Sequence, residues 1–272
     1  MAWELHWDEV RVLDANAESL GVSTSKLMDA AGKALAENVV TMIEDQSDSP
    51  SILILCGPGN NGGDGYVAAR YLNKILPNVT LTILSSHSEQ KTPLSQDVRD
   101  IASDANIAMH VWDSEDQSAF STTPTIIVDA LLGVGPGGIS SEPRGGISEI
   151  LEWVSESCKS ALVLACDVPT CLGSPKSLVT DRTVTFHSQK LGFSESDVGE
   201  VVVVPLPWPD ETLNPGPGDC KRYPSFSTKA RKGDRGRVLI VGGGPYHGAP
   251  VIAGMAATRV GCDLVHLAMP SN

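Results

Sequence analysis

The spacing of apolar residues is typical of helices in some segments of the chain and of strands in others. Residues 7–20 and 26–44 carry apolar side chains at helical spacing, whereas Ile52–Cys56 is apolar at every position, as a strand buried on both faces requires. Further predicted strands are 79–84, 110–112, 125–128, 161–165, 183–186 and 201–204, and 147–155 is predicted as a helix. This order of elements predicts an α/β domain built on a doubly wound, Rossmann-like parallel sheet with one crevice.

A glycine-rich turn, GPGNNGGDG, follows the first apolar run and opens into a helical pattern. Its five glycines are expected to permit positive φ and to remove the Cβ atoms that would keep a ligand from the backbone. Asn60, Asn61 and Asp64 add side-chain oxygens that suit a hard cation or a proton transfer. The alternative is a turn that serves tight packing alone. The turn also fits G-x-G-x-x-G, but no acidic residue occurs near Thr82–Ser86, where a dinucleotide site needs one.

Two further predicted strands end in aspartates. Asp129 comes directly after the apolar run 125–128 and precedes a second glycine-rich loop, and Asp167 follows the run 161–165, with Thr170 close behind. A lone aspartate in such a place is as often a helix cap or turn residue. Three oxygen-bearing strand ends together indicate a ligand site, because open α/β sheets bind ligands at the carboxyl ends of their strands.

At these residues the sequence resembles the NAD(P)H-hydrate epimerases, which also form the N-terminal half of bifunctional NAD(P)H-hydrate repair enzymes. The resemblance lies in GPGNNGGDG, VDALLG and DVPT, and it covers residues from about 7 to about 208. Two positions depart from the family pattern: Cys171 stands in place of glycine and Gly173 in place of aspartate. If position 171 requires positive φ, cysteine there should cost on the order of 1 kcal/mol or more.

The resemblance implies epimerisation at C6 of the hydrated nicotinamide ring of NADHX and NADPHX. It implies Asp167 as the carboxylate that moves a proton, with Asp64 as the second candidate. It further implies one potassium ion held by Asn61, Asp129 and Thr170. The substrate contacts that it implies are Asn60, Asn61, Gly62, Gly63, Asp64, Gly133, Val134, Gly135, Pro136, Gly137, Gly138, Ile139 and Asp167.

The segment TVTFHSQKLG, which resembles another part of the family pattern, contains His187 and Lys190. We interpret His187 as a hydrogen-bonded residue at a strand end rather than as a catalytic one. Lys190 has no role that the sequence assigns.

The C-terminal part divides into a linker and a short second domain. Residues 1–208 form the expected epimerase domain, and 209–228 are rich in proline and glycine without periodicity, as in a linker. Residues 229–272 resemble the opening of an ADP-dependent NAD(P)H-hydrate dehydratase with a ribokinase-like fold. A single β-loop-α-β unit cannot cover both faces of a parallel sheet. We therefore expect a truncated domain without dehydratase activity, loosely packed beyond about residue 215.

Composition narrows the classes of function. The 272 residues carry a formal net charge of −13, which disfavours a nucleic-acid-binding surface. No run of apolar residues is long enough for a membrane span and the N-terminus lacks a signal-peptide pattern, so we expect a cytoplasmic protein. Cys56 and Cys166 are expected to be buried thiols. A homodimer is among the possible assemblies, and the alternative function is a non-enzymatic protein-binding scaffold on the same domain.

Overall fold

The computed structural model describes residues 4–44, 50–120, 122–134, 142–193, 197–223 and 227–271. Two compact units make up the chain, residues 1–220 and 221–272, and we treat each by itself. Within the described residues, every helix is too short or too polar to cross a membrane.

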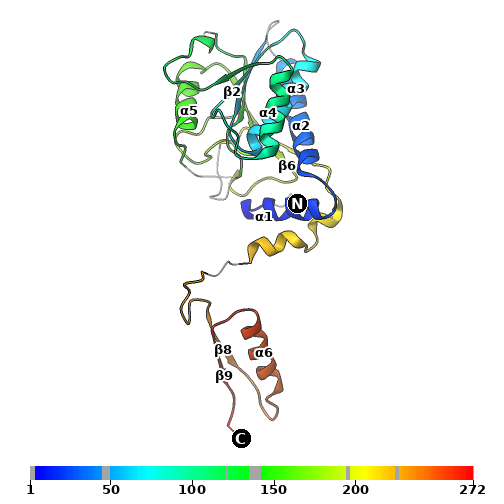
Figure 1. Ribbon diagram of the computed structural model, residues 1–272, viewed down its shortest axis with the longest axis vertical. Coiled ribbons are helices and arrows are strands. Elements are labelled where there is room, and N and C mark those ends of the chain that lie inside the picture. The colour runs from blue at the N-terminus through cyan, green and yellow to red at the C-terminus, as the bar shows by residue number, and fades with distance from the viewer. Residues whose placement is uncertain are drawn as a thin grey trace. The chain divides into compact units, whose positions relative to one another are not determined.

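The first unit is built on a seven-stranded, fully parallel sheet in the order β3-β2-β1-β4-β5-β6-β7 (Figure 1). Its strands are β1 (Ser51–Cys56), β2 (Thr80–Ser85), β3 (Ala108–Val111), β4 (Ile126–Ala130), β5 (Leu162–Cys166), β6 (Arg182–Phe186) and β7 (Glu200–Val204). The strand order reverses between β1 and β4, which pair in register from Ile52 with Ile126 to Cys56 with Ala130. The doubly wound, Rossmann-like prediction is confirmed, and β1 and β4 flank the point where such sheets bind ligands.

Helices cover both faces of this sheet. The helices α2 (Thr24–Glu44), α3 (Asn60–Ile75) and α4 (Pro93–Asp104) lie on one face, and α5 (Gly146–Ser157) lies on the other (Figure 1). Successive side chains of a strand point to opposite faces. Accordingly Ile52, Ile54 and Cys56 belong to the core under α2 and α3, while Leu53 and Leu55 belong to the core under α5. This explains why β1 is apolar at every position.

The remaining helix, α1 (Trp7–Ser19), packs against a segment that we expected to be linker. Two short 3-10 helices, Asp210–Leu213 and Pro217–Arg222, form there. The buried Asn16 side chain of α1 donates to the carbonyl oxygens of Thr212 and Asn214, and its Oδ1 accepts from the amide of Gly218 at 2.7 Å. Asn16 thus holds three backbone groups of this segment, and the compact first unit runs to residue 220.

The second unit contains the predicted β-loop-α-β element. Strands β8 (Arg237–Val241) and β9 (Leu264–Ala268) pair in parallel, and α6 (Gly248–Arg259) connects them. Large apolar side chains of this unit stay in solvent, such as Leu239 at 65% and Ile252 at 68% exposure. This exposure is what we expected of a parallel pair whose faces are not both covered.

The docking of residues 209–220 on α1 predicts the effect of Gly218→Ala. A Cβ at this position would lie 2.0 Å from the carbonyl oxygen of Val12. We expect a loss of about 1–3 kcal/mol in the free energy of unfolding, as for other overpacked sites, measured by urea denaturation. Gly248→Ala serves as the control, because its Cβ would meet nothing within 4 Å. Equal midpoints for wild type and Gly218→Ala would show that this segment does not pack on α1.

Candidate active site

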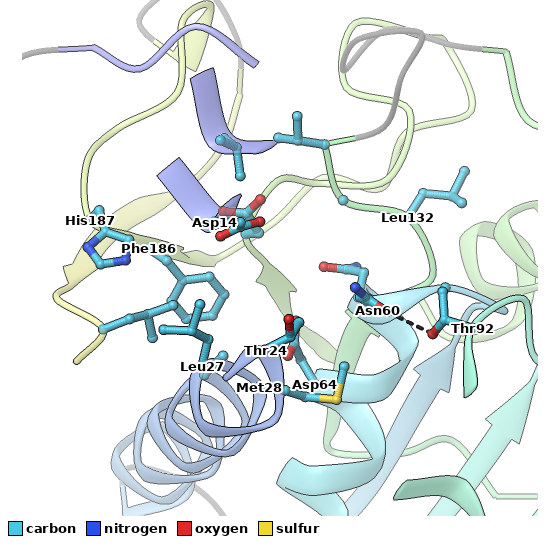
Figure 2. A pocket seen from close by; sticks show the side chains of 18 of the residues that line it. Asp14, Thr24, Leu27, Met28, Asn60, Asp64, Thr92, Leu132, Phe186 and His187 are labelled. Atoms are coloured by element: carbon cyan, nitrogen blue, oxygen red, sulfur yellow. Dashed lines mark hydrogen bonds between the residues drawn. The ribbon is translucent and has the colours of Figure 1, made fainter. Parts of the chain in front are cut away.

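A cavity of about 570 Å³ opens at the carboxyl ends of the central strands. This volume is in the usual range for small-molecule sites. In Figure 2, Asp14 reaches it from α1, and Asn60 and Asp64 reach it from α3, with Leu27, Met28 and Phe186 among the apolar lining. The polar or charged residues in its wall are Asp14, Thr24, Asn60, Asn61, Asp64, Lys91, Thr92, Asp167, His187 and Lys190.

The glycine-rich turn lets two backbone segments touch at the floor of this cavity. A Cβ on Gly57 would lie 1.7 Å from the carbonyl oxygen of Leu131, and one on Gly62 would lie 1.9 Å from that of Gly57. None of the five glycines has a positive φ, so that part of the prediction was wrong. The turn is shorter than expected, because α3 begins at Asn60. Gly57 and Gly62 allow the backbone segments to approach each other closely, and α3 carries the polar residues of the turn.

Asp129 and Thr170 form a buried pair behind the cavity wall. Neither side chain is exposed, and Thr170 Oγ1 donates to Asp129 Oδ1 at 2.6 Å. The amides of Thr170 and Leu131 also donate to the Asp129 carboxylate, at 2.8 and 3.2 Å. Burial raises the pKa of Asp129, and the hydrogen bonds from Thr170 and Leu131 oppose this rise. Oxygen atoms therefore lie close together around the Asp129 carboxylate, which is buried from solvent.

Asn61 extends from the first turn of α3 toward the loop after β4. A Cβ on Gly133 would lie 2.8 Å from Asn61 Oδ1, so the two are in close contact. Asn61 Nδ2 is buried without a hydrogen-bond partner among the described residues. Asn60 points to the rim instead, where its Oδ1 accepts from Thr92 Oγ1 at 2.8 Å (Figure 2).

Asp167 lies directly after β5 and makes a buried ion pair. Lys190 Nζ lies 2.8 Å from Asp167 Oδ1, with the side chains 2% and 14% exposed. Thr185 Oγ1 also donates to Asp167 Oδ1, at 3.2 Å. The carboxylate that we expected to move a proton thus has a cation at one of its oxygens.

Asp64 is a carboxyl group in a different environment. Burial raises its pKa well above the usual range, and the negative charges of Asp167 and Asp14 raise it further. The hydrogen bond that the structure gives its side chain is a weak one from Cys166 Sγ at 3.9 Å. Asp64 therefore favours its protonated form, and it differs from Asp167 in having no cation in contact with its side chain among the described residues.

Of the predicted site residues that the structure describes, six of ten line the cavity. Asn60, Asn61, Asp64, Gly133, Val134 and Asp167 all line the cavity. Gly62 and Gly63 do not; they pack against Gly57 and Met28 respectively. Asp129 and Thr170 lie behind Leu131 and Leu132. The predicted contacts Gly135, Pro136, Gly137, Gly138 and Ile139 lie outside the described residues.

Several cavity residues escaped the sequence analysis. Asp14 lies one turn after Val10 on the face of α1 that meets the cavity, and a charge on this otherwise apolar face was the available signal. Lys91 and Trp208 come from loops without a motif. Lys190 lies in a segment with a motif, but the sequence did not indicate its partner, which in the structure is Asp167.

The interpretation of His187 as a hydrogen-bonded residue was wrong. Its Nε2 is buried without a partner among the described residues, and its ring stacks on Trp208. Burial lowers the pKa of His187 to about 3, with a smaller contribution from the Lys190 ammonium. His187 is thus a neutral part of the wall near neutral pH.

Position 171 does require the left-handed conformation. Cys171 has a φ of 57°, and Gly173 two residues later has a φ of 86°. The cysteine is buried next to Thr170 and carries the cost, on the order of 1 kcal/mol, that glycine would avoid. Cys56 and Cys166 are buried thiols, as predicted.

A parallel α/β sheet with an acid-lined cavity at its switch point defines a Rossmann-like ligand-binding domain of the kind that enzymes use. Residues 24–192 match the family model described as "YjeF-related protein N-terminus". This match spans more than half of the chain, which therefore belongs to that family.

Curated relatives carry the name bifunctional NAD(P)H-hydrate repair enzyme Nnr. The protein of Hyperthermus butylicus is 39% identical over 97% of this chain and 50% of its own length. Those of Pyrobaculum aerophilum and Archaeoglobus fulgidus are 37% and 38% identical over 96% of this chain and 54% of their own lengths. The chain thus spans about half the length of these relatives. Their names give no support to the alternative of a non-enzymatic scaffold.

A solved structure shows the same fold. The crystal structure of yeast ynu0 superposes with a TM-score of 0.63 at 19% identity, covering 75% of this chain and 88% of the yeast chain.

The environment of Asp64 predicts how stability depends on pH. Because its pKa is higher in the folded than in the unfolded protein, the folded state binds an extra proton between those two values. Wild-type stability should therefore fall as pH rises from about 4 through the folded pKa. Asp64→Asn should remove this fall, so that the variant gains stability relative to wild type with rising pH. Urea midpoints across pH, with Asp104→Asn on the surface as control, measure the effect. Parallel curves for wild type and Asp64→Asn would contradict it.

Proposed function

We propose that the N-terminal unit is an NAD(P)H-hydrate epimerase, which interconverts the R and S forms of NADHX and NADPHX. The observation that carries the proposal is the pair of different carboxyl groups in one cavity, Asp167 beside an ammonium group and Asp64 in a desolvated, acidic setting. Two carboxyl groups in such different environments can act as the base and the acid of one reaction. The names of the curated relatives support the choice of substrate.

The reaction needs proton transfer without net redox. C6 of the hydrated ring carries a hydroxyl group and is bonded to N1, so it can open as a hemiaminal. Asp167 accepts the hydroxyl proton, the C6–N1 bond breaks with its electron pair going to N1, and Asp64 supplies the proton to N1. The resulting aldehyde rotates about the C5–C6 bond. Reclosure onto the other face reverses both proton transfers and inverts C6.

The shape of the cavity supports this chemistry. Leu27, Met28, Phe186 and Leu206 make much of the wall apolar, which limits the access of water to an opened ring. Lys91 is exposed and lines the same cavity near the start of α3. An ammonium group and a helix N-terminus suit the phosphates of a dinucleotide. We therefore place the hydrated ring at the carboxyl groups and the pyrophosphate toward Lys91.

The residues around Asp129 fit a potassium ion by their donor chemistry. The Asp129 carboxylate, Thr170 Oγ1 and the Leu132 carbonyl are hard oxygen donors within one hydrogen-bonded group, and Asn61 Oδ1 faces the adjoining loop at Gly133. A bound potassium ion would balance the buried charge of Asp129 and hold the loops after β4 and β5. Asn61, Asp129 and Thr170 are its proposed side-chain ligands.

The proposal concerns the first unit. We assign no dehydratase activity to residues 221–272, which contribute one β-α-β element. The cytoplasmic location, the homodimer and the lack of a nucleic-acid partner stay predictions from the sequence, and the net charge of −13 supports the last of these.

Asp167→Asn tests the proposed function directly. The amide is nearly isosteric but cannot accept the hydroxyl proton, so we expect a loss of about 10²–10⁴-fold in the rate of epimerisation. Chromatographic interconversion of R- and S-NADPHX measures the rate, and circular dichroism checks the fold. Asp104→Asn is the matched surface control. Wild-type activity in Asp167→Asn would remove this residue from the mechanism.

Potassium binding can be tested without activity. We expect potassium chloride to raise the thermal midpoint of the wild type above its value in choline chloride at equal ionic strength. Asp129→Asn and Thr170→Val should abolish this difference. Thr180→Val is the matched control, because Thr180 is buried but its hydroxyl has no partner among the described residues. A potassium response that survives in both site variants would place the ion elsewhere.

A further inference from the structure

Lys190 is a buried cation to which neither the sequence nor the proposed mechanism gives a role. Besides the ion pair, its Nζ donates to Thr185 Oγ1 at 2.9 Å, to the Phe186 carbonyl at 3.0 Å and to the Ser188 carbonyl at 3.4 Å. An ammonium group at 2% exposure is costly unless it is paired and hydrogen-bonded. Because these four acceptors engage all three of its protons, Lys190 has none left for a substrate.

The contacts of Asp167 are one-sided. Oδ1 accepts from both Lys190 and Thr185, whereas no hydrogen bond joins Oδ2 to any part of the chain that the structure describes. Thr185 links the two charges, because its hydroxyl accepts from Lys190 and donates to Asp167. Oδ2 is therefore the oxygen that stays available on the cavity side.

The backbone of Asp167 is also held in an unusual conformation. Its φ is 62°, in the left-handed region that costs a non-glycine residue about 1–2 kcal/mol. The Asp167 amide donates to the Val184 carbonyl at 2.8 Å, which ties this residue to β6. Strain of this kind persists only where surrounding contacts maintain it. The ion pair is one of those contacts, since Lys190 follows the same strand.

The chain before α1 fixes Lys190 in turn. The Leu5 amide donates to the Gln189 carbonyl at 2.7 Å, and the Leu191 amide donates to the Leu5 carbonyl at 3.1 Å. Leu5 is 1% exposed, so this short bridge on either side of Lys190 lies in the interior.

Lys190 is the ammonium group that pairs with Asp167. Asp14 on α1 lines the same cavity, Asp64 on α3 favours its protonated form, and Cys166 on β5 is a buried thiol. His187 is neutral near neutral pH, and its ring packs on Trp208. Among the described residues, Lys190 is therefore the cation in contact with Asp167.

We propose that Lys190, assisted by Thr185, is a positioning residue that fixes Asp167 through Oδ1 and leaves Oδ2 to accept the substrate proton. The proposal rests on the assignment of Asp167 as the proton acceptor. It adds that Lys190 acts through Asp167 and does not itself touch the substrate.

Lys190→Met tests this role because methionine fills a similar volume without the charge. We expect kcat for NADPHX epimerisation to fall about 10²-fold, as for a misplaced catalytic group, while KM stays within about threefold. Lys176→Met, which breaks an exposed ion pair with Glu152, is the matched control and should leave kcat and KM unchanged.

Three results would overturn the proposal. A fall in kcat that accompanies loss of the native circular dichroism spectrum would make Lys190 a structural residue only, and a large rise in KM with kcat unchanged would make it a substrate-binding one. Unchanged kinetics in Lys190→Met, with Asp167→Asn inactive, would refute the positioning role and leave the proposed function standing. By contrast, an active Asp167→Asn would refute the proposed function itself.

Thr185→Val provides a second test if Lys190→Met does not fold. It removes the hydroxyl between the two charges but keeps both charges and nearly the same volume. We expect kcat to fall about tenfold with KM unchanged, since a hydrogen bond to a charged group is lost. Wild-type kcat in a folded Thr185→Val would contradict the proposed part of Thr185 and, with Lys190→Met unfolded, the proposal as a whole.

Discussion

The close contact between Gly57 and the Leu131 backbone is the constraint on which the site depends. β1 and β4 are neighbours at the switch point, and their following loops meet without any intervening side chain. A Cβ on Gly57 would lie 1.7 Å from the Leu131 carbonyl oxygen, so any other residue would push the two loops apart. With the loops in contact, α3 starts directly over the sheet. Its polar first turns then face the aspartates that follow the neighbouring strands.

Three aspartates that look alike in the sequence acquire different properties from their surroundings. Asp129 is buried among neutral donors, Asp64 is buried beside other acids, and Asp167 is paired with Lys190. Burial alone raises a carboxyl pKa, and only a cation or good hydrogen bonds oppose it. One sheet edge thus holds three carboxyl groups in three different environments, as the proposed cation site, acid and base require.

The sequence predicted those parts of the structure that follow from local pattern. The all-apolar β1, the strand-end positions of Asp129 and Asp167, and the left-handed turn at Cys171 each have a local signal. The docking of residues 209–220, the stacking of His187 on Trp208 and the place of Asp14 have none, because they depend on packing between distant segments. The positive φ expected of the glycine turn is absent, and close packing is what requires Gly57, Gly62, Gly63 and Gly65.

The cavity combines a matched family segment with chain on either side of it. The proposed proton-transfer groups, Asp64 and Asp167, and the anchoring Lys190 all lie within residues 24–192. Leu5, Val10 and Asp14 come before this segment and Leu206 and Trp208 after it, yet all five line the same cavity. Leu5 also brackets Lys190 through two backbone hydrogen bonds. The flanking chain therefore does more than cover the site, because it holds in place the lysine that pairs with Asp167.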